Sequence, residues 1–63
     1  METVKIDNTT INFYFNEKVV AVALLQADEY YLYFNAGGYE ARVLQMCLDN
    51  LNTLNNNLTE EIK

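Results

Sequence analysis

Few side chains in this sequence of 63 residues are suited to covalent chemistry. Histidine, the commonest acid–base group of enzymes, is absent. Cys47 is the single cysteine and lies among leucines, which favours a buried, inert thiol over a nucleophile. Asp28 and Glu29 are adjacent carboxylates in a polar segment, where solvated side chains are commoner than metal ligands. We therefore expect no enzyme, no catalytic residue, no metal site and no cofactor.

Tyrosines are the other chemically useful side chains, and they favour recognition. Tyrosine is typical of protein interfaces, because its ring is apolar and its hydroxyl can still form hydrogen bonds. Tyrosines on a sheet can also stack nucleic-acid bases, but such modules surround them with positive charge. Here the four basic residues are widely spaced and the net charge is −5. Direct nucleic-acid binding is therefore disfavoured.

Four short segments with strand character precede one segment with helical periodicity. Polar turns separate the predicted strands, which cover residues 3–7, 11–15, 19–25 and 30–34. Gly37-Gly38 then allow a sharp change of direction, which we prefer to the alternative of an anion site at a helix N-terminus. The sequence thus predicts a single α+β domain over residues 1–63, an antiparallel four-stranded meander followed by one helix on one face (ββββα).

The lengths of the turns predict the register of the sheet. A three-residue turn would place Phe15 opposite Val19, and a four-residue turn would place Leu25 opposite Tyr30. A four-residue first loop would place Val4 opposite Phe13. All three registers agree on one apolar face beneath the helix: Val4, Ile6, Ile11, Phe13, Phe15, Val19, Ala21, Ala23, Leu25, Tyr30, Leu32 and Phe34.

The helical segment starts near Tyr39 and carries an apolar stripe. The stripe consists of Leu44, Cys47, Leu48, Leu51, Leu54, Leu58 and Ile62. Asn55 opens a run of three asparagines, which are mediocre helix formers, so the sequence leaves open whether the helix continues past it. Such a helix is longer than the sheet. We expect Leu54 and Leu58 to overhang the sheet and to serve self-association.

One helix covers one face of a four-stranded sheet and leaves the other uncovered. The uncovered face is predicted to carry Lys5, Asn12, Tyr14, Val20, Val22, Leu24, Tyr31 and Tyr33. A contiguous patch of tyrosines and aliphatic side chains marks an interaction site. Its partner is a second copy packed back to back, a different protein, or a small ligand.

Size and composition bear on assembly and location. A chain this short buries only about 60% of its surface, and small scaffolds need a disulfide, a metal or oligomerisation. A single cysteine excludes an internal disulfide, so we expect a homodimer. The first residues do not resemble a signal peptide, and the longest apolar run, residues 19–25, is too short to span a bilayer. These features predict a cytoplasmic protein with no membrane association.

Together these features predict a small acidic protein-binding module that acts as an inhibitor or adaptor of another protein. Its size, acidity and asparagine content are similar to those of accessory proteins of phages and mobile elements. One alternative is a protein that binds or sequesters a small ligand or nucleotide signal at the dimer interface. Another is an acidic mimic of nucleic acid that blocks a nucleic-acid-binding enzyme.

Overall fold

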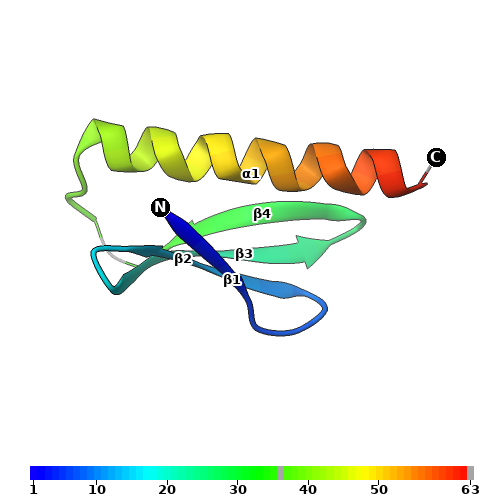
Figure 1. The fold of residues 1–63 in the computed structure, drawn as a ribbon, viewed down its shortest axis with the longest axis horizontal. Coiled ribbons are helices and arrows are strands. Elements are labelled where there is room, and N and C mark those ends of the chain that lie inside the picture. Colours follow the sequence, from blue (N-terminus) through cyan, green and yellow to red (C-terminus); the bar gives the residue numbers. More distant parts are fainter. Residues whose placement is uncertain (36, 63) are drawn as a thin grey trace.

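The computed structural model of this chain describes the backbone of residues 1–35 and 37–62, and the side chains of residues 1–35 and 37–58. Within these residues four strands precede a helix: β1 (Glu2–Lys5), β2 (Thr10–Phe15), β3 (Lys18–Gln26), β4 (Glu29–Phe34) and α1 (Ala41–Ile62). The strands form one antiparallel sheet in the order β1-β2-β3-β4, and α1 lies along one face of it (Figure 1). The predicted ββββα fold is confirmed.

Two-residue turns join β2 to β3 and β3 to β4. Their residues all have positive φ: Asn16 (51°), Glu17 (65°), Ala27 (51°) and Asp28 (64°). Positive φ at both positions is the type I′ geometry, whose twist matches that of the flanking strands. The second turn is shorter than predicted but leaves the register unchanged. Leu25 lies opposite Tyr30 as expected, and Ala23 lies opposite Leu32.

The pairing at the end of β2, next to the first of these turns, differs from the prediction. Because that turn has two residues, Phe15 pairs with Lys18 and not with the predicted Val19. Further from the turn the predicted register holds, with Phe13 opposite Ala21. The two registers differ by one residue, so β3 contains a bulge at this point.

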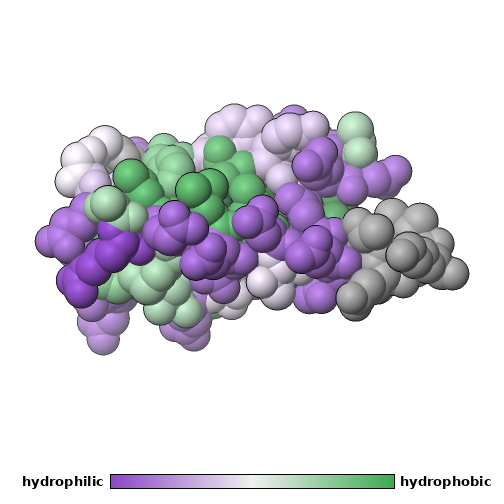
Figure 2. Space-filling view, turned by 90° about the horizontal axis from the view of Figure 1, so that it is seen from above, coloured by the Kyte–Doolittle hydropathy of each residue, from purple (hydrophilic) through white to green (hydrophobic). Residues whose placement is uncertain are grey.

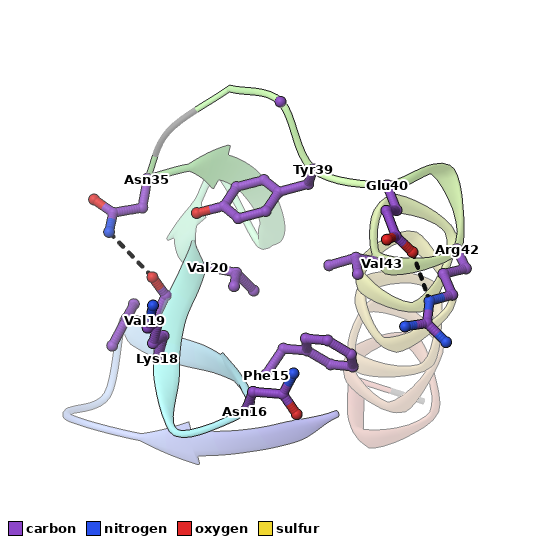
Figure 3. A pocket seen from close by; sticks show the side chains of 11 residues that line it. Phe15, Asn16, Lys18, Val19, Val20, Asn35, Tyr39, Glu40, Arg42 and Val43 are labelled. Atoms are coloured by element: carbon purple, nitrogen blue, oxygen red, sulfur yellow. Dashed lines mark hydrogen bonds and ion pairs between the residues drawn. The ribbon is translucent and has the colours of Figure 1, made fainter.

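The bulge reverses the predicted sides of Val19 and Val20. Val20 is only 4% exposed and lies on the helix side together with Ala21. Val19 pairs with Tyr14 on the other face. Figure 3 shows the side chains of Val19 and Val20 on opposite sides of β3. The prediction that Val20 belongs to the uncovered face is therefore wrong.

The pairing of β1 is also one residue away from the prediction. Val4 lies opposite Asn12, not opposite Phe13, and Lys5 lies opposite Ile11. A one-residue slip moves every side chain of a strand to the other face. Lys5 therefore lies on the helix side, and Val4 lies on the uncovered face with Ile6, which is 54% exposed.

A side-chain turn in the first loop explains this slip. The carboxylate of Asp7 accepts hydrogen bonds from the backbone N–H of Thr9 (2.8 Å) and from its hydroxyl (3.0 Å). The backbone N–H of Ile6 then donates to the carbonyl of Thr10 (2.8 Å), which closes a three-residue loop where four were predicted. The hydrogen bond from the Thr9 backbone also lowers the pKa of the Asp7 carboxyl.

The core lies between α1 and the sheet. Its buried members are Ile11, Phe13, Val20, Ala21, Ala23, Tyr30, Val43 and Cys47. Ala21 and Ala23 are completely buried in the central strand, where small side chains leave room for larger ones from β2 and α1. Close packing at the centre thus depends on the small side chains of β3.

The helix differs from its prediction in length and in its inward face. It continues through the asparagine run to Ile62, and Leu54 and Leu58 are half-buried against the core, so the predicted overhang of these two leucines is wrong. The side chain of Ile62 lies outside the described residues. Val43 is buried, whereas Leu48, predicted to face the sheet, is 44% exposed.

Candidate functional site

The sheet surface that α1 does not cover is the candidate site, and we call it the outer face. Its members follow from the observed register: Val4, Ile6, Asn12, Tyr14, Val19, Val22, Leu24, Tyr31 and Tyr33. Of the predicted interface residues, the structure brings together Tyr14, Val22, Leu24, Tyr31 and Tyr33. It removes Lys5 and Val20 and adds Val4, Ile6 and Val19. The changes make this surface more apolar than the sequence predicted.

Four large hydrophobic side chains of the outer face are exposed, namely Val4, Ile6, Tyr31 and Tyr33, and the other five members are half-buried. Tyr31 is 44% exposed and Tyr33 is 49% exposed, and they point the same way because they are two residues apart in β4. They lie opposite Leu24 and Val22 of β3, so rings and aliphatic chains alternate across the strands. Figure 1 shows α1 on the other side of the sheet. Contiguous patches of this kind mark interaction surfaces.

The charges around the outer face are negative. Glu2 lies opposite Tyr14, and Glu29 accepts a hydrogen bond of 3.4 Å from the hydroxyl of Tyr31, so both carboxylates border this face. Lys5 and Lys18 lie on the helix side, because each pairs with a residue that faces α1. Among the described strand residues, the outer face therefore carries no basic side chain. This arrangement disfavours a phosphate backbone as its partner.

A second candidate site is a pocket near the start of α1. Its volume is about 660 Å³, and its walls include Phe15, Val20, Tyr39 and Val43 (Figure 3). The basic side chain of Lys18 also lines it.

Arg42 and Glu40 at the rim of this pocket interact with each other. The Arg42 guanidinium forms an ion pair of 2.9 Å with Glu40 and lies 5.9 Å from the centroid of the Phe15 ring. Both charged side chains are more than two-thirds exposed, so the ion pair contributes little to stability. The pocket suits a small anion with an apolar body and lies within one chain, not at the predicted dimer interface.

Cys47 lies in the core, away from both sites. Its side chain is completely buried, and burial raises the pKa of the thiol. A protonated, inaccessible thiol is a poor nucleophile. Within the part of the chain that the structure describes, no group of three or more histidine, cysteine, aspartate or glutamate side chains is placed to hold a metal ion.

Comparisons of the chain with protein-family models, curated proteins and solved structures gave no match. The helical residues that the structure describes do not form a segment long and apolar enough to cross a bilayer.

The residues that set the observed registers were missed in the sequence-based prediction, although their types and spacing indicate the turns that they form. Asp7 and Thr9 have the spacing of a side-chain turn, which fixes the shorter first loop and puts Val4 and Ile6 on the outer face. Asn16 tolerates positive φ, which favours a two-residue turn and hence the bulge that turns Val19 to the outer face.

Proposed function

We propose that this protein is a non-catalytic cytoplasmic module that binds another protein through its outer face and acts as an inhibitor or adaptor. One observation carries the proposal: an apolar, tyrosine-rich sheet face is left uncovered, while the lysines of the sheet lie on the opposite side. The partner that fits is a protein surface with an apolar centre and basic residues at its margin, where they meet Glu2 and Glu29.

The experiment is affinity capture from cells of the native host with purified, tagged protein. Replacing Tyr14 and Tyr31 together with serine removes two rings from the outer face. Loss of one such anchor costs at least about 2 kcal/mol of binding free energy, or roughly thirtyfold in Kd. We expect the double variant to lose the partner while its circular dichroism spectrum stays that of the wild type.

Controls carry the same kind of change elsewhere on the protein. Thr53→Ser with Asn56→Ser alters two exposed positions of the helix, and this variant should retain the partner. Retention by the tyrosine variant, or loss by the helix variant alone, would show that a different surface binds. Capture that disappears at moderate salt in the wild type would instead favour mimicry of nucleic acid.

Mimicry is the weaker alternative because the acidic side chains are far apart. Glu17 and Asp28 lie in turns at opposite ends of the nine-residue β3, roughly 30 Å apart at about 3.3 Å per residue. To imitate a row of phosphates, the protein would need further carboxylates between Glu17 and Asp28, and β3 contains none.

The pocket at the start of α1 supports a second candidate, binding of a small anion with an apolar body. Lys18 and Arg42 are basic side chains of this site that the outer face does not have, and Arg42 is paired with Glu40. A Lys18→Ser variant in the same capture experiment should retain the protein partner. If it loses the protein that the wild type captures while the tyrosine variant keeps it, that protein binds at the pocket and not at the outer face.

A further inference from the structure

The two edges of the sheet differ in how they are protected from pairing with another strand. Natural edges are shortened, charged or interrupted. β1 is four residues long and includes Glu2 and Lys5. β4 is six residues long, its register with β3 is continuous, and residues 30 to 39 carry no charge. Beyond Tyr30, β4 therefore lacks the charges and the bulge that normally prevent edge-to-edge pairing.

Backbone groups of β4 point outward at alternate residues. The backbone N–H of Asn35 donates to a β3 carbonyl (3.0 Å), so the backbone N–H and C=O groups of the odd-numbered residues point toward β3. The backbone groups of Tyr30, Leu32 and Phe34 point toward the open edge. At Tyr30 the side chain of Asn55 closes the edge, accepting from the N–H (2.7 Å) and donating to the carbonyl (3.2 Å). Among the described residues, none bonds the outward groups of Leu32 and Phe34.

We propose that a second copy of this chain pairs with β4 in antiparallel orientation about a two-fold axis, with Leu32 of each copy opposite Phe34 of the other. This register engages every outward N–H and C=O that Asn55 leaves open, which makes four backbone hydrogen bonds. Other registers lose some of these bonds because Tyr30 is closed. Pairing at this edge is inferred from the backbone groups and charges of β4 and α1, while the support from the area of the outer face rests on the proposed function.

The helix offers an apolar side chain at the matching position. Tyr30 and Asn55 are in contact, so distances along β4 and α1 can be counted from them. Tyr33, at the proposed axis, is three strand residues from Tyr30, or about 10 Å. Leu48 is seven helical residues from Asn55, which is also about 10 Å. Leu48 therefore lies level with the axis, where it meets its counterpart. It is 44% exposed, and Figure 2 shows hydrophobic atoms gathered along one flank of α1 beside a polar row.

Charge and area favour a second copy over a different protein at this edge. The chain has a net charge of −5, yet the helix positions on this flank are uncharged: Ala41, Leu44, Gln45, Leu48 and Asn52. A two-fold interface packs the same flank of both copies together, with residue i against residue j and j against i, so a flank with charges of one sign would repel its copy. The outer face of one four-stranded sheet covers roughly 400 Å², which is about half of the ~800 Å² that each side of a standard interface buries. The eight-stranded sheet of a dimer would double the area of the outer face.

A charge introduced at Leu48 tests the proposal, because position 48 would lie next to position 48 of the other copy. In sedimentation equilibrium the wild type should approach twice its 7.3 kDa mass as concentration rises. Leu48→Glu and Leu48→Lys should each weaken self-association at least about tenfold, or 1.4 kcal/mol. An equal mixture of the two variants, one of them ¹⁵N-labelled, should form the heterodimer in native mass spectrometry.

Position 53 supplies the matched control. Thr53 is exposed and, five residues further along α1, is turned to the other flank, so Thr53→Glu and Thr53→Lys should dimerise like the wild type. A monomeric wild type at every concentration up to its solubility limit would overturn the proposal. So would dimerisation of a Leu48 variant alone, or a Leu48 mixture that stays monomeric while circular dichroism shows both variants folded.

Discussion

Replacing Phe13 by alanine is expected to leave the protein largely unfolded at room temperature. The Phe13 side chain is completely buried, and with Cys47 it is one of the two largest fully buried side chains of the described residues. Truncation of a buried phenylalanine lowers the free energy of unfolding by about 3–5 kcal/mol, because it removes contacts and leaves a cavity. A chain of this size has a total of only about 3–9 kcal/mol. Urea unfolding followed by circular dichroism measures the loss.

Phe34→Ala is the matched control for this prediction. Phe34 is 40% exposed, and its ring makes a tilted contact with Tyr39 at a centroid distance of 6.4 Å. Its truncation should lower the free energy of unfolding by only about 1 kcal/mol, since less apolar area returns to water. Equal losses for the two variants would contradict the packing of the core described above.

Asn55→Ala is expected to lower the free energy of unfolding by about 1–2 kcal/mol. The Asn55 amide makes two hydrogen bonds to the backbone of Tyr30, a residue that is only 7% exposed. Its removal leaves a buried donor and acceptor unpaired, which costs about 1–3 kcal/mol, and the higher helix propensity of alanine returns about 0.5 kcal/mol.

Asn56→Ala provides the comparison, since Asn56 is the next residue in the same helix and is exposed. There alanine should raise the free energy of unfolding by a few tenths of a kcal/mol, through helix propensity alone. Two variants with the same shift in urea midpoint would show that the hydrogen bonds to Tyr30 contribute nothing.

The order of the elements and the register of β3 with β4 could be predicted, because both depend on patterns that are local in sequence. Strand alternation, the change to helical periodicity and the position of the turn at Asp28 are all visible in the chain. The alanines of β3 also predicted correctly which face carries the helix, since their small side chains fit beneath it.

The errors in register arose from hydrogen bonds that composition does not show. Asp7 shortens the first loop by bonding to Thr9, and this one-residue change turns Val4 to the outer face. In the helix, a stripe beginning at Leu44 and a stripe beginning at Val43 both fit the periodicity. The second of these faces the sheet, since Val43 is buried and Leu48 is exposed, and Asn55 contacts β4 in this orientation of the helix.

The candidate site was found in part. Tyr14, Tyr31 and Tyr33 were recognised because alternation places them on one face, and the structure brings them together. Val20 was placed on that face in error, since a bulge breaks the alternation on which the prediction depended. Aromatic content therefore located the surface, while its exact membership depended on turn geometry.

Photocrosslinking from the outer face tests most directly whether that face binds a partner protein. Benzoylphenylalanine in place of Tyr14 puts the reactive group on β2, away from the β4 edge, and the same group in place of Thr53 puts it on an exposed position of α1 that is also turned away from that edge. After irradiation in native host cells, we expect an adduct with a different protein from position 14 and none from position 53. An adduct from position 53 alone would contradict the account.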